Sequence, residues 1–75
     1  MNNMKFEFTI GNGMGASSLI LANPKFDGGI LRATQVAELE YREYNGTPVY
    51  RKCDAREVII GGGLFFLSEY KGEIN

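Results

Sequence analysis

The sequence Asn-Gly-Thr-Pro at residues 45–48 lies between two segments of alternating character and constrains the fold more than any other stretch. Asn-Gly is the strongest short-range signal for a β-hairpin, because a type I′ turn needs a positive φ at both central residues. A two-residue loop at this point would pair Tyr41 with Tyr50 and Glu40 with Arg51. Cross-strand pairs of these kinds each contribute about 0.2–1 kcal/mol. The sequence therefore predicts a hairpin centred on this turn.

The first arm of the hairpin, residues 34–44, also has features of a helix. Thr34 can serve as an N-cap, and the Asn-Gly pair can end a helix. A helix, however, would leave Leu39 outside its apolar face and place Glu40 on that face. A strand groups five apolar residues on one face, with Gln35 as the only polar residue among them: Leu31, Ala33, Ala37, Leu39 and Tyr41. We therefore prefer a strand, and one helix near 34–44 is the alternative.

The N-terminal half of the chain carries two further strand signals. Residues 5–10 alternate between polar and apolar side chains, which is typical of a half-buried strand. Residues 19–22 form a short apolar run that Asn23-Pro24 is expected to end. Asp27-Gly28-Gly29 then predicts a turn.

The C-terminal half combines a cap signal with two apolar runs. Asp54 followed three residues later by Glu57 resembles a capping box, which predicts a single helical turn at 54–57. Residues 58–60 and 64–67 are apolar at every position, so we expect two paired strands that are buried on both faces and joined by glycines. The polar residues 68–75 are expected to end the domain.

Together these patterns predict a mostly β protein with a single domain over residues 1–75. The expected architecture is a small antiparallel curled sheet or open barrel of five or six short strands. The alternative is an α+β fold with one helix near residues 34–44.

The composition excludes several kinds of site. A chain of 75 residues buries only about 60–65% of its unfolded surface, so its own core gives marginal stability. Cys53 is the only cysteine and there is no histidine, which excludes an internal disulfide, the usual structural zinc sets and a Cys-His nucleophile. No catalytic or metal site and no cofactor is predicted. Homo-oligomerisation is the remaining common source of stability, and we expect a homo-oligomer.

Charge and hydropathy limit the partners. The net charge is −1, with eight basic and nine acidic residues spread along the chain, so no strong nucleic-acid signal is present. No apolar run approaches the roughly 20 residues that a membrane span needs, and no signal peptide is evident. A lone free thiol without a secretion signal favours a cytoplasmic location.

A glycine-rich stretch is the first candidate binding site. Its pattern G-x-G-x-x-A matches a dinucleotide-binding fingerprint, in which backbone amides approach a pyrophosphate at a helix N-terminus. The pattern alone is weak, since the chain is too short for a complete βαβ sheet and Pro24 would cut the helix short. A plain hairpin loop is the simpler interpretation. If a small anionic ligand binds, we expect it at these residues: Gly11, Gly13, Gly15, Ser17 and Ser18.

Aromatic residues provide the second candidate site. Tyrosine is enriched at interfaces, and large exposed apolar residues can join two subunits. The candidate interface residues are Tyr41, Tyr44, Tyr50, Phe65 and Phe66.

These features lead to two hypotheses for the function. The first is a non-catalytic small binding protein that occupies or sequesters a partner protein, as an inhibitor encoded by a phage or mobile element would. The alternative is a sponge for a small nucleotide-like ligand, which would bind at the glycine-rich loop and a subunit interface. An enzyme is not expected.

Overall fold

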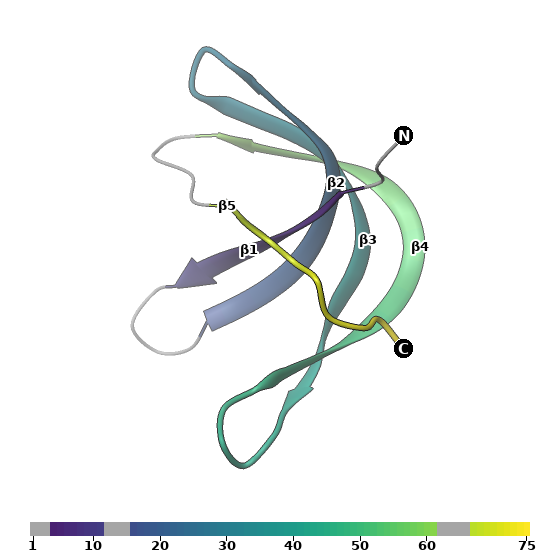
Figure 1. Cartoon of the computed structure of the whole chain (residues 1–75). Coiled ribbons are helices and arrows are strands. Elements are labelled where there is room, and N and C mark those ends of the chain that lie inside the picture. Colours follow the sequence, from purple (N-terminus) through teal and green to yellow (C-terminus); the bar gives the residue numbers. More distant parts are fainter. Residues whose placement is uncertain (1–3, 12–15, 62–66) are drawn as a thin grey trace.

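The computed structural model describes residues 4–11, 16–61 and 67–75, which form five strands (Figure 1). In chain order these strands are β1 (Lys5–Gly11), β2 (Ala16–Asp27), β3 (Ile30–Arg42), β4 (Pro48–Gly61) and β5 (Leu67–Glu69). They make one antiparallel sheet in the order β4-β3-β2-β1-β5, which curls without closing. The described residues contain no helix, and therefore none that could cross a membrane. The predicted small, mostly β open sheet is confirmed.

Strand β3 settles the choice between strand and helix at residues 34–44. Leu31, Ala33, Gln35 and Ala37 are buried, and the residues between them are more exposed. This period of two is the pattern of a strand, and a helix would instead repeat its burial every three to four residues. The helix alternative is wrong, because cross-strand burial on two neighbours outweighs the local helix preference of this segment.

The hairpin between β3 and β4 is confirmed, but its predicted register is wrong. Leu39 rather than Tyr41 faces Tyr50, and Glu38 rather than Glu40 faces Arg51. Arg51 forms an ion pair and hydrogen bond with Glu38. The turn, which has one residue more than predicted, accounts for one position of this difference, and a register shift between Leu39 and Tyr41 accounts for the second.

The turn holds three residues instead of two. The Gly46 N–H donates to the Glu43 carbonyl oxygen and the Glu43 N–H donates to the Thr47 carbonyl oxygen, each at 2.8 Å. Gly46 has a φ of 92°, whereas Asn45 does not have a positive φ. This is the pattern of a type I turn followed by a left-handed glycine. Asn45 instead uses its side chain, whose Oδ1 accepts a hydrogen bond from the Thr47 N–H at 3.0 Å.

The two-residue turn with positive φ at both positions lies at the β2–β3 connection. Gly28 and Gly29 have φ values of 58° and 84°, and they join the facing pair Asp27 and Ile30. The predicted turn at residues 27–29 is therefore confirmed. The predicted end of the strand at Asn23-Pro24 is wrong, because β2 continues to Asp27. Asn23, with a φ of 54°, lies within a register shift that admits the proline.

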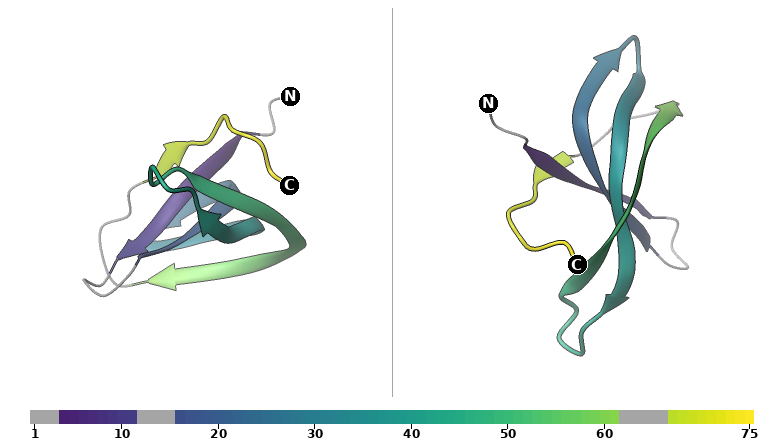
Figure 2. Two further views of the ribbon diagram at one scale, coloured as in Figure 1. Left: turned by 90° about the horizontal axis from the view of Figure 1, so that it is seen from below. Right: turned by 90° about the vertical axis from the view of Figure 1, so that its right-hand side faces the viewer.

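Strand β4 bends where the predicted helical turn was placed. The pairs Gln35–Arg56 and Ala37–Lys52 set three residues of β4 against Val36 alone, so β4 bulges at residues 53–55. Figures 1 and 2 show the resulting curvature of β4. The helical turn at 54–57 is wrong, because these residues belong to the bulged strand and Glu57 pairs with Thr34.

Two hydrophobic clusters hold the sheet. The first contains Phe8, Leu21, Leu31 and Ala33, with four partly buried residues against it: Leu19, Val58, Ile60 and Leu67. The second contains Ile20, Ala37 and Tyr50, with Val36, Leu39, Tyr70 and Ile74 against it. Ile20 and Leu21 are consecutive, fully buried and in different clusters. Since consecutive strand residues point to opposite faces, both faces of the sheet are covered at this point.

The C-terminal segment connects the two edges of the sheet. Leu67 pairs with Phe8 of β1, so the expected pairing of residues 64–67 with 58–60 is wrong for Leu67. The chain then crosses to the other edge, where Ile74 forms a parallel bridge with Tyr50. The Asn75 N–H donates to the Tyr50 carbonyl oxygen at 3.0 Å, and the Lys52 N–H donates to the Asn75 carbonyl oxygen at 2.6 Å. Residues 70–75, called the C-terminal strap below, therefore cover the second cluster.

Candidate functional site

The tip of the β3–β4 hairpin carries the most exposed aromatic side chain among the described residues. Tyr44 has a relative accessibility of 110%, and Tyr41 has one of 53%. Figure 2 shows this hairpin extending away from the other strands. Tyrosine buries a large amphipathic surface on binding and has only two χ angles to fix, so an exposed tyrosine on a protruding turn suits recognition.

The backbone of this tip is fixed by the turn described above and by Arg42. The Arg42 Nη1 donates to the Gly46 carbonyl oxygen at 3.2 Å, and its Nη2 donates to the Ser18 Oγ at 3.3 Å. One guanidinium thus connects the turn to the body of the sheet. Because a rigid loop loses little entropy on binding, this arrangement presents Tyr44 in a preorganised way.

The anchor for Arg42 belongs to a buried polar group. Ser18 is 3% exposed, and its hydroxyl lies 3.2 Å from the Thr9 Oγ1. Nearby, the buried Tyr50 hydroxyl donates a hydrogen bond to the Glu7 carboxylate. Burial, and then the hydrogen bond to Glu7, raise the pKa of Tyr50 well above its usual range. These contacts stabilise the protonated phenol and leave it a structural hydrogen-bond donor at neutral pH.

The predicted glycine-rich site is only partly within the described residues. Gly11 and Ser17 lie in the β1–β2 ladder, where they face Ala16 and Ile10. Gly13 and Gly15 lie outside the described residues. The helix of a dinucleotide-binding unit is absent here, because residues 16–27 form β2. Ser18 is buried and shares its hydroxyl with Thr9 and Arg42, as described above, so this oxygen faces the protein interior.

The structure separates the predicted aromatic residues. Tyr41 and Tyr44 are exposed, whereas Tyr50 is fully buried and makes an edge-to-face contact with Tyr70, with ring centroids 5.0 Å apart. Phe65 and Phe66 lie outside the described residues. A role for any of these residues in an interface stays a prediction, as does homo-oligomerisation.

Two surface hollows and the contacts of Arg42 were not predicted from the sequence. One hollow of about 290 Å³ is lined by Lys5, Val36, Lys52, Gly72 and Ile74. A second, of about 220 Å³, is lined by Asn23, Lys25, Arg32, Ala33, Thr34 and Glu57. No local sequence pattern marks either of them, because each combines residues from strands that are distant in the chain. Within the described ranges, no three His, Cys, Asp or Glu side chains are grouped to hold a metal ion.

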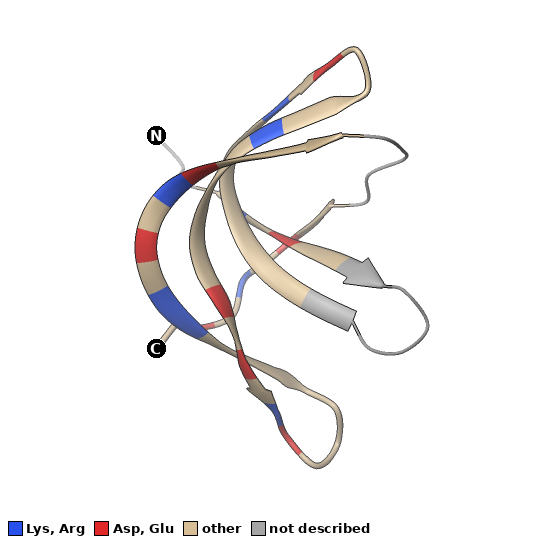
Figure 3. Ribbon diagram, turned by 180° about the vertical axis from the view of Figure 1, so that it is seen from behind, with Lys and Arg blue, Asp and Glu red and all other residues tan. Residues whose placement is uncertain are grey.

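The outer edge of the sheet is strongly charged. Figure 3 shows basic and acidic residues alternating along β4, and all five are exposed: Arg51, Lys52, Asp54, Arg56 and Glu57. Charges on an edge strand oppose the addition of another strand. The charges along β4 therefore disfavour the addition of a strand at this edge.

Comparisons of the chain with protein-family models, with curated proteins and with solved structures find no match.

Proposed function

We propose that this chain is a non-catalytic binding protein that recognises a partner protein through the tip of the β3–β4 hairpin. The observation that supports this proposal is the full exposure of Tyr44 on a turn that hydrogen bonds fix from both sides. Tyr44 would be the central contact and Tyr41 a flanking one. Binding would occupy a surface of the partner and thereby inhibit it, as a phage-encoded inhibitor does.

Energetics agree with an anchoring role for Tyr44. An aromatic residue that fills a pocket at the centre of an interface commonly contributes 2 kcal/mol or more, as an order of magnitude. The folded hairpin leaves the Tyr44 ring in water, so its burial would be gained only on binding. The Arg42 contacts to Ser18 and Gly46 keep the turn oriented relative to the sheet.

The test is affinity capture from the native host with immobilised wild-type protein, followed by measurement of the dissociation constant for the captured protein. We expect Tyr44→Ala to weaken binding by about 30-fold, the equivalent of about 2 kcal/mol. Ile59→Ala removes an exposed apolar side chain of β4, away from the tip, and should bind like the wild type. A partner that binds Tyr44→Ala and the wild type equally well would contradict the proposal.

A further inference from the structure

The hollow of about 290 Å³ lies between β1, β3, β4 and the C-terminal strap. Its two charged lining residues are Lys5 and Lys52, which come from the opposite edge regions of the sheet. No carboxylate is among its lining residues. The ion pairs within the described part of the chain are Arg51–Glu38 and Lys71–Glu69, so neither lining lysine is neutralised by one.

The strap holds both lysines in place through their backbones. The Tyr70 N–H donates to the Lys5 carbonyl oxygen at 2.7 Å, and the Lys52 N–H donates to the Asn75 carbonyl oxygen. Gly72, between these two attachments, forms part of the wall. These hydrogen bonds use backbone atoms only and do not engage the side chain of either lysine.

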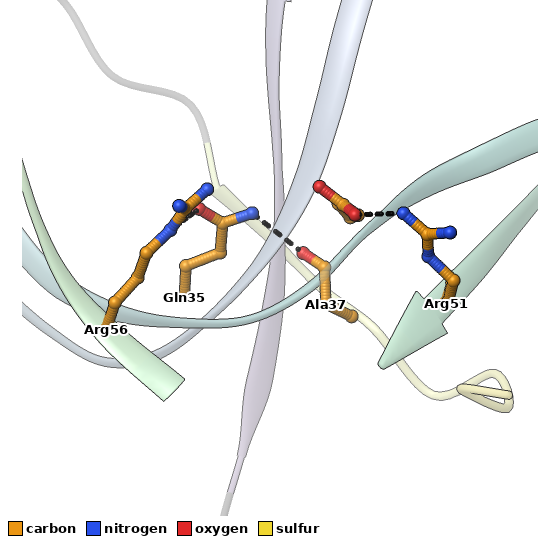
Figure 4. Close-up of polar contacts among 5 residues, drawn as sticks. Gln35, Ala37, Arg51 and Arg56 are labelled. Atoms are coloured by element: carbon orange, nitrogen blue, oxygen red, sulfur yellow. Dashed lines mark hydrogen bonds and ion pairs between the residues drawn. The ribbon is translucent and has the colours of Figure 1, made fainter. Parts of the chain in front are cut away.

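The bulge of β3 provides an apolar side to this hollow. Val36 is the extra residue of β3 at its register shift against β2, and both Val36 and Ile74 pack against the second cluster. The Gln35 side chain makes hydrogen bonds on both sides of the bulge (Figure 4). Its Nε2 donates to the Ala37 carbonyl oxygen at 3.3 Å, and its Oε1 accepts from the Arg56 Nε at 3.2 Å. Bulges often re-aim a side chain next to a functional site.

We propose that this hollow binds a small phosphate monoester, with Lys5 and Lys52 at the phosphate and Val36 and Ile74 at its organic group. Two lysine residues line one hollow, so their combined charge matches the double negative charge of a phosphate monoester, and lysine binds phosphate as a point charge. The volume lies just below the range of sites for drug-sized ligands, which limits the organic group to a small one.

Two other places that could bind an anion are less suitable, because of the charges and hydrogen bonds of the residues there. The hollow at Lys25 and Arg32 includes the Glu57 carboxylate among its lining residues, which opposes an anion. At the glycine-rich stretch, Ser18 already shares its hydroxyl with Thr9 and Arg42. The Lys5–Lys52 hollow combines two cations, apolar contacts and a lining without carboxylates.

The test is titration of the full chain with phenyl phosphate, inorganic phosphate and phenol, followed by amide chemical shifts in NMR and by calorimetry. We expect phenyl phosphate to bind more tightly than inorganic phosphate, and phenol to bind least. The largest shifts should fall at Lys5, Val36, Lys52 and residues 72–74. Tyr44→Ala should not change this affinity, so the outcome is independent of the proposed protein partner.

Variants of the two lysines test whether these residues bind the phosphate. Lys5→Gln and Lys52→Gln should each weaken phenyl phosphate binding by about tenfold. Lys71→Gln removes a highly exposed strap lysine that does not line the hollow, and it should bind like the wild type. Absence of saturable binding at millimolar phenyl phosphate, unchanged affinity in Lys52→Gln, or shifts confined to other residues would each overturn the proposal.

Discussion

Val36 and Ala37 are consecutive in β3, yet both pack with the cluster that contains Tyr50. In a regular strand these two side chains would point to opposite faces. The register shift between Gln35 and Ala37 rotates the strand at this point. As a result Ala33 and Ala37, which an unbroken alternation would place on one face, belong to different clusters. The bulge therefore lets one strand contribute to the cores on both faces of a small sheet.

Gln35 stabilises this bulge, and we expect its replacement to be costly. Gln35→Glu keeps an acceptor for Arg56 but loses the donor to the Ala37 carbonyl oxygen, and it buries a carboxylate at a residue that is 4% exposed. The free energy of unfolding should fall by about 1–3 kcal/mol. Urea unfolding followed by circular dichroism measures this change.

Arg56→Ala is the control for Gln35. It removes the hydrogen bond to Arg56 that Gln35→Glu keeps, and it does so from the exposed partner, so we expect a loss of less than about 1 kcal/mol. An equal loss in Arg56→Ala and Gln35→Glu would contradict the expectation that the hydrogen bond to the Ala37 carbonyl oxygen is the more important of the two contacts of Gln35.

The alternating segments allowed much of the fold to be predicted. Residues 5–10 and the arm from Leu31 to Tyr41 alternate clearly, and both are strands. The irregularities could not be predicted, because a bulge depends on the partner strand rather than on local sequence. The turn at Asn45-Gly46 shows the same limit. A type I′ turn and a three-residue turn both accept glycine at the last position, yet they differ by one residue in register.

The candidate sites, too, could be predicted from the sequence only in part. Tyr44 could be selected from the sequence, because a residue beside an Asn-Gly turn is expected to be exposed. The contact of Arg42 with Ser18, and the approach of Lys5 and Lys52 to one hollow, join residues that are distant in the chain. These depend on the curl of the sheet and on the strap, and the polar residues 68–75 gave no local indication of either.

We expect the fold to require a glycine at position 46 because of the backbone conformation there. Its φ of 92° is one that residues with a Cβ rarely adopt, although a Cβ there would meet no atom within 4 Å. Gly46→Ala should therefore lower the free energy of unfolding by about 1–2 kcal/mol through backbone strain alone. The measurement is again urea unfolding.

Gly61→Ala is the matched control for Gly46→Ala. Gly61 has no positive φ, and the nearest atom to an added Cβ is the Ile30 Cγ1 at 3.9 Å. We expect a neutral or slightly stabilising effect, since alanine loses less conformational entropy than glycine on folding. Similar losses in both variants would contradict the explanation from φ.

We expect the fold to require a glycine at position 72 for a different reason, which is the close approach of the Tyr70 side chain. A Cβ at Gly72 would lie 2.6 Å from the Tyr70 Oη and 2.7 Å from its Cζ. The Tyr70 ring is held by its contact with Tyr50 and by a 3.0 Å hydrogen bond from its hydroxyl to the Glu73 carbonyl oxygen. Gly72→Ala should displace the strap and accelerate hydrogen exchange of the Lys52 and Asn75 amides.

A double variant tests the cause of that displacement. Tyr70→Ala removes the ring that an alanine at position 72 would meet. The loss of stability in the Gly72→Ala, Tyr70→Ala double variant should then be smaller than the sum of the two single losses. Additive losses would show that the clash with Tyr70 is not the reason that position 72 is a glycine.

The stability of the fold should fall at alkaline pH because of Tyr50. An unfolded tyrosine ionises near pH 10, whereas burial and the Glu7 carboxylate raise the pKa of Tyr50 in the folded chain. Above about pH 10 the unfolded state therefore binds fewer protons than the folded state, and the free energy of unfolding decreases by up to about 1.4 kcal/mol per pH unit. Below that pH the contribution of Tyr50 is fully present. Burial also raises the pKa of Tyr70, which acts in the same direction.

Tyr50→Phe separates this titration from other alkaline effects. At neutral pH the variant should lose about 1–3 kcal/mol, because the Glu7 carboxylate loses its donor. Its stability should then decline less steeply than that of the wild type when urea unfolding is repeated between about pH 9 and 11. Tyr44→Phe, which removes a fully exposed hydroxyl, should retain the wild-type slope. If Tyr50→Phe declined as steeply as the wild type, the alkaline loss would have to arise from groups other than the Tyr50–Glu7 pair.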